Sequence, residues 1–284
     1  MDVLLQAGHD VEFIDLGSST DAPLPEVGAC DVNLLVTGIY AFARFAKRGL
    51  PRHGKHVLWM FDPLTKNASA TVHRYKADLF DAIAPNLSAV MAMDGSIERY
   101  LHQYFPALPA FRLPYLVADK HVRTPLPETQ RTRDIIMLGG DTARRREAER
   151  FFLERTEISV KTQFIWSGLW GAARDACRAS ARISLNVHAD AELHYFDQFR
   201  AFETWAAGTA VVSDRFEGWE DFGIEPGVHM VMAELRDMPQ ACAELVVDMS
   251  RRQAMVQASQ KLLRDRFSPA VWERRMLAML ESVA

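Results

Sequence analysis

The chain has 284 residues, with 33 Lys or Arg against 37 Asp or Glu, and its formal net charge is −4. Hydrophobic residues make up 49% and charged residues 25%, values that exclude a disordered, collagen-like or coiled-coil protein. The mildly acidic balance excludes a general nucleic-acid-binding surface but allows a local basic site for a phosphorylated small molecule.

The cysteines and the apolar runs indicate the compartment. Cys30, Cys177 and Cys242 are widely spaced and form neither a CxxC pair nor a metal-ligand pattern, which suits a reducing cytoplasm. No apolar run reaches the roughly 18–20 residues of a membrane span, and the first residues lack the basic region of a signal peptide. We expect a cytoplasmic protein with no transmembrane segment. Peripheral attachment at the inner membrane face and a homo- or hetero-oligomer stay open.

The first 120 residues alternate short apolar runs with amphipathic stretches, which is typical of a parallel sheet covered by helices. The expected strands are Val11–Leu16, Val32–Val36, His56–Phe61, Ala89–Met93 and Phe111–Leu113, and the expected helices include Tyr40–Arg48 and Ser96–Tyr104. The residues before Val11 resemble the last turn of a helix that ends at Gly8. The domain is therefore expected to lack its first strand, either because the true start lies upstream or because the domain is natively trimmed.

A second alternating series follows residues 117–133, which contain Pro125 and Pro127, show little periodicity and predict a linker. Its strands are expected at 134–138, 160–166, 183–187 and 209–212, and its helices at 143–155, 198–207, 238–249, 251–266 and 269–283. We therefore expect an α/β protein with two doubly wound, Rossmann-like domains that face each other across a cleft. Residues 1–120 form the first domain, residues 134–266 the second, and residues 267–284 a helix that packs back toward the first.

A pair of glycines ends the first strand of the second series and leads into a basic helix. Gly139 and Gly140 allow the backbone to approach a ligand closely, and a helix N-terminus attracts anions. Arg144, Arg145 and Arg146 are unfavourable in this first turn, because cations belong at the other end of a helix. A bound diphosphate would remove the conflict and accept bidentate contacts. The alternative is a solvated basic face that pairs with glutamates of the same helix.

Two further motifs carry polar groups to strand ends and helix faces. Asn186 and His188 end the strand at 183–187, and for His188 alone a satisfied loop histidine is the better interpretation. Glu203 lies three residues after Arg200, on the same face of an apolar helix. Because a lone buried carboxylate is costly, Glu203 either pairs with Arg200 or accepts the two hydroxyls of a ribose.

Taken together, these stretches resemble glycosyltransferases of the two-domain GT-B fold, and more narrowly the group 1-type and CgeB-like family. The resembling stretches are 180–188, 199–214, 218–227, 264–267 and the turn 139–146, with weaker matches at 59–63, 93–94 and 113–114. The resemblance implies a nucleotide-diphosphate sugar held mainly by the second domain and an acceptor on the first. It implies no cofactor besides this donor substrate.

The resemblance also implies roles for single residues. By position, Glu203 matches the glutamate that holds the donor ribose, and Arg144 or Arg145 matches the basic residue at the diphosphate. Asn186 and Arg200 match polar positions that line the donor pocket, and His188 joins them at the same strand end. Arg144 and Glu203 are the residues we expect to carry catalysis.

One position departs from the family and leaves the stereochemistry open. Many group 1 transferases carry a second glutamate eight residues before the ribose glutamate, where this chain has Tyr195. The resemblance favours retention of configuration, and arginines at the diphosphate would stabilise the leaving group without a metal ion. An inverting reaction would need a base, for which Asp62, Asp94 and His9 are the candidates in the first domain. The alternatives are a turn residue for Asp62 and a helix cap for Asp94.

Two functions of different kinds remain open. The first is an active glycosyltransferase with an unknown acceptor, which Arg144 and Glu203 favour. The second is a non-catalytic nucleotide-sugar-binding or partner subunit of the same fold, which the missing first strand and Tyr195 favour. A sugar-nucleotide 2-epimerase shares the architecture, but it would need a dense set of acid and base groups that the sequence does not show.

Overall fold

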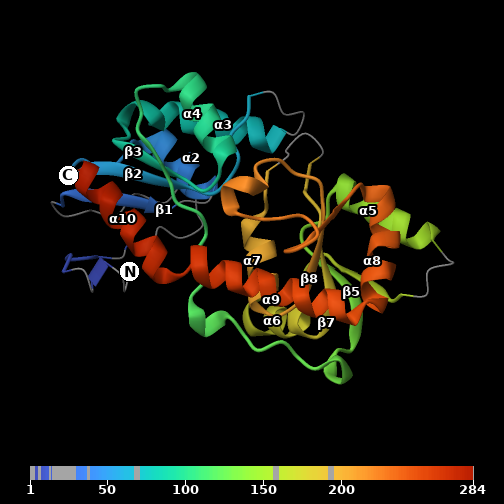
Figure 1. Ribbon diagram of the computed structural model, residues 1–284. Coiled ribbons are helices and arrows are strands. Elements are labelled where there is room, and N and C mark those ends of the chain that lie inside the picture. Colours follow the sequence, from blue (N-terminus) through green and yellow to red (C-terminus); the bar gives the residue numbers. More distant parts are fainter. Residues whose placement is uncertain are drawn as a thin grey trace. The chain divides into compact units, whose positions relative to one another are not determined.

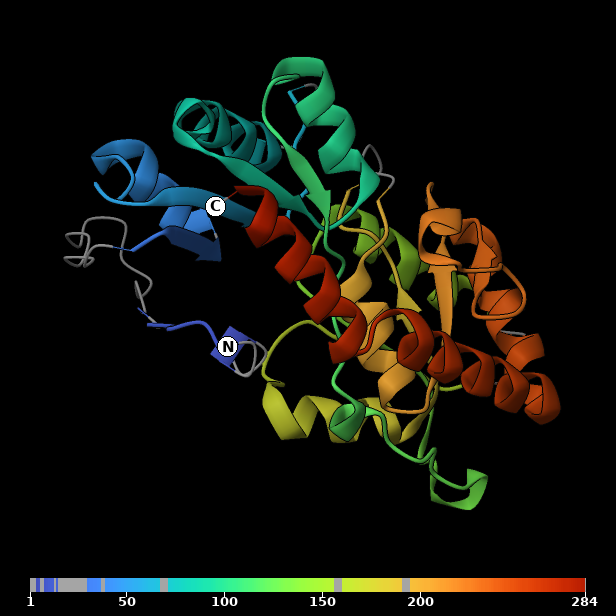
Figure 2. The same cartoon turned by 60° about the vertical axis from the view of Figure 1, so that its left-hand side comes forward.

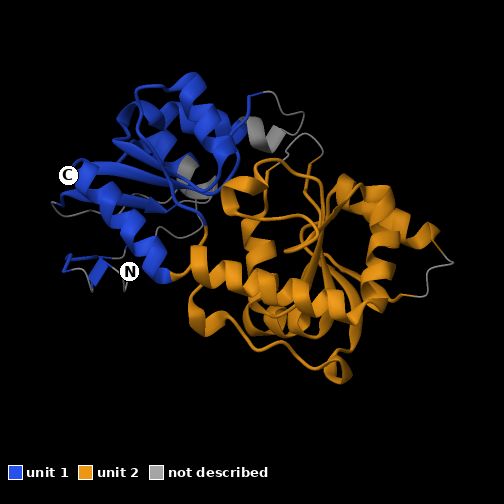
Figure 3. Cartoon of the chain, viewed as in Figure 1, with its two compact units in different colours: residues 1–114, 269–284 blue, residues 115–268 orange. Residues whose placement is uncertain are grey.

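The computed structural model describes residues 4–5, 8–12, 14, 30–36, 39–66, 71–155, 160–190 and 195–283. The chain forms two compact units, one of residues 1–114 together with 269–284 and one of residues 115–268 (Figure 3). No helix in these described ranges is long and apolar enough to cross a membrane. The cleft expected between the two domains stays a prediction.

Unit 1 is built on a four-stranded parallel sheet with the order β1-β2-β3-β4 (Figure 1). Its strands are β1 (Val32–Val36), β2 (Lys55–Met60), β3 (Ala89–Ala92) and β4 (Ala110–Arg112). Its helices are α2 (Ile39–Arg48), α3 (Thr71–Ile83), α4 (Gly95–Tyr104) and α10 (Pro269–Val283), with a 3-10 turn at Ala84–Asn86. All four residues of β3 are buried, as an entirely apolar central strand requires.

The C-terminal helix α10 belongs to unit 1 although it follows unit 2 in the sequence. Near its start, the ring of Trp272 lies 5.5 Å from the ring of Trp59 in β2. At its end, the Val283 carbonyl accepts a hydrogen bond of 2.6 Å from Lys55, the first residue of β2. These two contacts align α10 antiparallel to β2, and Figure 2 shows the helix alongside the sheet.

Unit 2 contains a five-stranded parallel sheet with the order β6-β5-β7-β8-β9. Its strands are β5 (Arg133–Leu138), β6 (Thr162–Ile165), β7 (Ala181–Asn186), β8 (Ala210–Asp214) and β9 (Val231–Ala233). Its helices are α5 (Ala143–Glu154), α6 (Gly171–Ala179), α7 (Gln198–Ala206), α8 (Met238–Val247) and α9 (Met249–Arg266). Short 3-10 turns lie at Asp119–His121, Glu128–Gln130, Trp219–Phe222 and Leu235–Asp237. The strand order reverses between β5 and β7, and sheets of this kind bind ligands at the carboxyl ends of such a pair.

Strand β5 shows why both faces of this sheet are covered. Ile135 and Met137 pack into the core on the side of α5 and α8. Ile136 and Leu138 point the other way and pack with Cys177 of α6. Because successive strand residues face opposite sides, an unbroken apolar run predicts a strand with helices on both faces. The expected pair of parallel-sheet α/β domains is therefore confirmed, and unit 2 shows the reversal of strand order that makes a sheet doubly wound.

Most expected elements are present, with ends shifted by a few residues. The expected strand Val11–Leu16 is wrong in its described residues, because Val11, Glu12 and Ile14 form no strand there. Its remaining residues lie outside the described ones. An apolar alternation becomes a strand only when a neighbouring strand offers backbone partners. The turn before it is present: Gly8 has φ 86° and donates to the Leu5 carbonyl at 3.1 Å.

Residues 115–133 belong to unit 2 instead of forming a free linker. Val117 is buried in the aromatic core of unit 2, and its N–H donates to the Phe267 carbonyl at 3.0 Å. The Arg123 carbonyl accepts a hydrogen bond of 2.9 Å from Gln260 of α9. The linker prediction is thus corrected, since a segment without periodicity can still be held by single buried side chains and backbone bonds.

Two elements of unit 2 were not predicted. Strand β9 has three residues, too few for an alternating pattern to be recognised. Helix α6 begins at Gly171 and has nine residues, three of them buried at its C-terminal end. Strand β9 pairs with β8, and Cys177 of α6 packs against Ile136 and Leu138 of β5. Helix α6 also supplies the two arginines that pair with Glu203.

Candidate functional site

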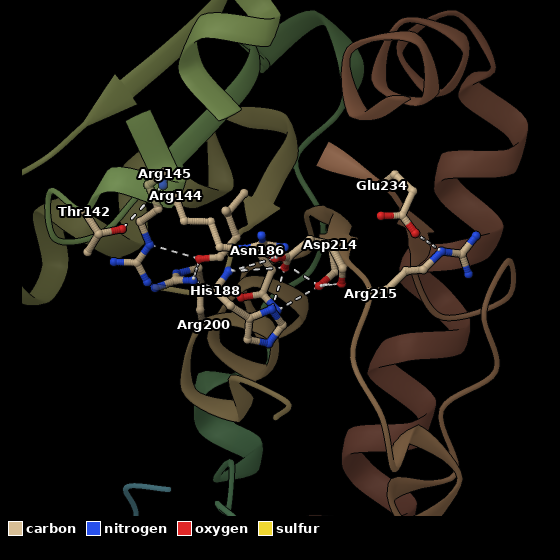
Figure 4. A network of polar contacts seen from close by, with 11 residues as sticks. Thr142, Arg144, Arg145, Asn186, His188, Arg200, Asp214, Arg215 and Glu234 are labelled. Atoms are coloured by element: carbon tan, nitrogen blue, oxygen red, sulfur yellow. Dashed lines mark hydrogen bonds and ion pairs between the residues drawn. The ribbon is translucent and has the colours of Figure 1, made fainter. Parts of the chain in front are cut away.

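The candidate site lies where β5 and β7 end in unit 2 (Figure 4). Thr142 caps α5 by accepting a hydrogen bond from the Arg145 N–H, so the helix begins directly after the Gly139–Gly140 turn. A Cβ added at Gly139 would lie 3.1 Å from Nη1 of Arg145 and 3.3 Å from Nη2 of Arg200. The glycine thus lets two guanidinium groups pack against the turn.

Arg145 connects the ends of the two central strands. Its Nε donates to the Val187 carbonyl at 2.9 Å, after β7, and its Nη1 donates to the Gly140 carbonyl at 3.0 Å, after β5. The side chain is buried, and burial together with the nearby charge of Arg200 lowers its pKa to about 10. Two cations that lie close together in a poorly solvated environment are stabilised by an anion.

Arg200 reaches the same strand ends from α7. Its Nε donates to the Leu138 carbonyl at 3.1 Å, and its Nη1 donates to the Asn186 side chain and the Val187 carbonyl, each at 3.0 Å. Asp197 caps α7 by accepting from the Arg200 N–H and also pairs with the Arg200 guanidinium at 3.1 Å. Burial opposes ionisation of Asp197, but the contacts with Arg200 outweigh it and lower the pKa of the carboxyl.

Asp214, the last residue of β8, contacts both Arg144 and His188. The side chain is 1% exposed, and its Oδ2 accepts from Nε and Nη2 of Arg144 at 3.0 and 2.9 Å. Its Oδ1 lies 2.5 Å from Nδ1 of His188 and accepts from the His188 N–H at 3.2 Å. Burial works against the charged carboxylate, but the bonds from His188 and Arg144 prevail, so the pKa of Asp214 is lowered.

The structure brings together seven of the residues that the sequence singled out for donor binding. They are Gly139, Gly140, Arg144, Arg145, Asn186, His188 and Arg200. In this cluster three guanidinium groups face two carboxylates, those of Asp197 and Asp214. The surplus positive charge lies at the N-terminus of α5, which is itself positive.

Glu203 lies one helical turn beyond Arg200 and takes partners from α6. Its carboxylate is 2.5 Å from Nη1 of Arg178 and 3.3 Å from Nη2 of Arg174, and its side chain is 23% exposed. The pairing of Glu203 with Arg200 that the sequence offered is wrong, because the Arg200 guanidinium points to the strand ends. Nearby, burial and then the charge of Glu203 raise the pKa of Tyr115.

The three candidates for a base in the first domain lie in unit 1. Asp62 is 2.7 Å from Nζ of Lys76, and His9 is exposed beside the Gly8 turn. Asp94 is buried and caps α4, accepting from the Ser96 N–H at 2.8 Å. The helix-cap interpretation of Asp94 is therefore confirmed.

Four residues of the site had been given no role from the sequence, although each carried some signal. Asp214 is an acidic residue that ends an apolar strand, and Asp197 is a residue type that favours helix N-caps. Arg174 and Arg178 are four apart and share one face of α6. Across the described ranges, no group of three or more His, Cys, Asp or Glu is placed to hold a metal ion.

A comparison with known families matches a segment that runs from α5 of unit 2 into α10 of unit 1. Residues 146–281, slightly less than half of the chain, match a family model described as "Glycosyl transferase-like". No curated protein shows significant similarity to the chain.

Solved structures share the fold at low sequence identity. TarM superimposes with a TM-score of 0.67 at 13% identity, over 93% of this chain and 55% of TarM. Sucrose-phosphate synthase from Thermosynechococcus elongatus gives 0.64 at 12% identity, over 89% of this chain and 73% of that enzyme. Anabaena HepE in complex with UDP-glucose gives 0.64 at 12% identity, over 88% and 78%.

These likenesses show that the chain has the GT-B fold. The chain spans about half the length of TarM, the first of these structures. A mutant of S. aureus TarM was solved with fondaparinux, α-GlcNAc-glycerol and UDP, and HepE was solved with UDP and glucose.

Proposed function

We propose that the chain is a glycosyltransferase that moves a sugar from a nucleotide-diphosphate sugar to an acceptor. One observation carries the proposal: Arg145 and Arg200 pack against the Gly139 turn at the N-terminus of α5, and Arg144 adds a third guanidinium group in the first turn of that helix. These three cations outnumber the two carboxylates paired with them. The Gly139 turn lies at the point of a doubly wound sheet where phosphates bind. The family match over residues 146–281 and the UDP complexes of structures with this fold support a nucleotide-diphosphate sugar.

The chemistry follows from where charge develops. When the bond between the sugar and the diphosphate breaks, positive charge builds on the ring and negative charge on the leaving diphosphate. Arg144 and the free N–H groups of α5 stabilise that negative charge more strongly in the transition state than in the bound donor. We propose that these groups provide the stabilisation that a metal ion gives in other transferases. We also propose retention of configuration and membership of the CgeB-like branch, both from the sequence resemblance.

Glu203 is proposed to hold the donor ribose. A carboxylate offers about four lone-pair sites, and the two arginines of α6 use one on each oxygen. The sites left over can accept the two vicinal ribose hydroxyls, and the partial exposure of Glu203 allows a ligand to reach them. Arg174 and Arg178 would then fix the orientation of the carboxylate.

Unit 1 is proposed to bind the acceptor, whose class (glycan, lipid, protein or small molecule) is left open. If the reaction inverts configuration, Asp62 is the strongest candidate for a base, since it is 35% exposed and follows the carboxyl end of β2. Asp94 is weaker in that role, because its carboxylate is buried and committed to the α4 cap.

The test uses the full chain with a panel of UDP- and GDP-sugars. We expect slow hydrolysis of at least one donor, which mass spectrometry detects. The same donor should raise the melting temperature of the protein. Arg144→Ala should remove the hydrolysis. Arg150→Ala is the matched control, because Arg150 lies on the same helix with an exposed side chain.

Three outcomes would contradict the proposal. Binding of a donor with no hydrolysis of any donor would support a non-catalytic subunit that binds nucleotide sugars. Failure of every nucleotide to bind would reject the site itself. Equal hydrolytic activity of Arg144→Ala and Arg150→Ala would mean that Arg144 does not contribute to catalysis.

A further inference from the structure

One nitrogen in the site is buried without a partner. His188 is 3% exposed, and among the residues that the structure describes its Nε2 finds no hydrogen-bond partner. Two aromatic rings lie near the imidazole, Tyr195 at 5.6 Å and Phe216 at 6.0 Å between centroids. A buried polar atom without a partner is destabilising, and a ligand that bonds to it removes that cost.

The other ring nitrogen is strongly held. Nδ1 of His188 is 2.5 Å from Asp214, which lies in the core at the end of β8, and the His188 N–H donates to the same carboxylate (Figure 4). With Nδ1–H bound to Asp214, a neutral imidazole has only a lone pair on Nε2, whereas a protonated one has an N–H donor there. The charge state of the ring therefore decides which ligand atom Nε2 can contact.

The position of His188 relative to the arginines indicates the ligand. Arg145 donates both to Val187, the residue before His188, and to Gly140 of the glycine turn. Arg144 is bound to the same carboxylate as His188. An anion held by this turn and these arginines therefore lies at the side of His188.

We propose that the His188–Asp214 pair is a proton-linked contact for the diphosphate of the donor. When the diphosphate binds, the pair takes up one proton from solvent, and Nε2–H of His188 donates to a phosphate oxygen. Asp214 acts as a positioning residue that orients the ring and balances its charge. The inference rests on the proposed function, because it assumes a diphosphate at the glycine turn.

The charges around the imidazole explain why uptake depends on the ligand. The cations come from two helices, Arg144 and Arg145 from α5 and Arg200 from α7. The carboxylates come from β8 (Asp214) and from the cap of α7 (Asp197), and Tyr195 is the titratable ring beside them. The two negative charges of a bound sugar nucleotide add to those of Asp214 and Asp197 and favour the protonated ring.

The experiment is calorimetric titration of the full chain with UDP-glucose and, in parallel, GDP-mannose. Sugar nucleotides lack the terminal phosphate whose second pKa lies near 6, so their own titration does not interfere. For the wild type we expect uptake of about one proton per ligand near pH 7, seen as a binding enthalpy that depends on the ionisation enthalpy of the buffer. Affinity should be roughly tenfold higher at about pH 6 than at about pH 8.

Two variants separate the two ring nitrogens. His188→Asn keeps an amide donor near Asp214 but removes Nε2, and should lose about tenfold in affinity at pH 6 together with the proton uptake. His188→Gln places an amide near the position of Nε2 and should recover part of the affinity without any pH dependence. His121→Gln, at an exposed histidine of unit 2, is the matched control and should behave as the wild type.

Several results would overturn the inference. One is a wild-type binding enthalpy that does not depend on the buffer, a result that needs no variant. Another is a pH dependence that persists in His188→Gln. If His188→Asn weakens UDP-glucose but leaves UDP unaffected, Nε2 contacts the sugar instead. If the wild type binds neither probe, the proposed function fails and this inference fails with it, whereas binding without proton uptake contradicts the inference alone.

Discussion

Unit 2 carries two arginine clusters at opposite ends of the same parallel sheet. The site cluster lies at the carboxyl ends of the strands and contains Arg144, Arg145 and Arg200. The strap cluster lies at the amino ends, around the segment that leads into β5, and contains Arg131, Arg182 and Arg252. Each has three guanidinium groups and two carboxylates, so the number of charges does not distinguish them.

In the strap cluster, carboxylates and main-chain carbonyls of the chain itself accept the hydrogen bonds of the arginines. Glu128 accepts from Arg182 and lies within 2.9 Å of Arg252, and Arg131 donates to the Gly208 carbonyl at 2.7 Å. Arg252 also donates to the Leu245 carbonyl at 2.7 Å, in the last turn of α8, where the helix dipole is negative.

The site cluster lies at a helix end of the opposite sign. Arg144 and Arg145 occupy the first turn of α5, where the helix end is positive and adds to their charge. The dipole of α8 therefore favours Arg252 in the strap cluster, whereas the dipole of α5 adds to the positive charge of Arg144 and Arg145 in the site cluster. The difference is one of environment, and four substitutions test it.

The largest expected effect is on the strap cluster. Glu128→Ala leaves two buried arginines without their carboxylate, and we expect the free energy of unfolding to fall by about 3 kcal/mol in urea titration. Affinity for a nucleoside diphosphate should not change in the folded protein. Loss of nucleotide binding with intact stability would reverse the roles assigned to the two clusters.

The next effect belongs to the site cluster. The double change Arg144→Ala and Arg145→Ala removes two charge-assisted contacts and should weaken UDP by about 100-fold, while uridine changes little. Calorimetric titration of both ligands measures the difference. Equal losses for UDP and uridine would mean that the arginines shape the pocket without binding the diphosphate.

A change at Glu203 should lower the affinity for UDP and for uridine by the same factor. Glu203→Gln keeps one acceptor oxygen but loses the charge, and should weaken UDP and uridine each by about tenfold if the carboxylate holds the ribose. Glu225→Gln is a control within unit 2 but outside this ion-pair group. Unchanged affinity for both ligands would leave Glu203 as a structural partner of Arg174 and Arg178 alone.

The smallest effect is on acid stability. The pKa of Asp214 is lowered in the folded state, so its contribution to stability is present above the unfolded pKa of about 3.9 and is lost as pH falls through the folded value. Asp214→Asn should therefore be less stable than the wild type near pH 7, with the difference narrowing below about pH 4. Thermal unfolding at several pH values measures it, and a difference that does not depend on pH would exclude this linkage.

How far the sequence reaches is seen in single residues. Gly139, Arg145 and Asn186 were expected at one site because parallel strands end at one edge, and the structure brings them together. Arg200 was also expected at this site. The ion pair between Arg200 and Glu203, which helical spacing allowed, is absent, because Arg200 bonds to Leu138 and Glu203 pairs with Arg178. Helical spacing identifies which residues share a face, but it does not say which neighbouring element that face meets.

The sequence by itself determined two parallel-sheet units and the edge at which the polar residues gather, since strand and helix periods are local properties of the chain. Only the tertiary structure decided the partners: Asp214 with Arg144 and His188, and Glu203 with the arginines of α6. It also decided that α10 packs against β2 of unit 1. These pairings depend on strand order and on the rotation of each helix against the sheet, which are set by packing between segments distant in sequence.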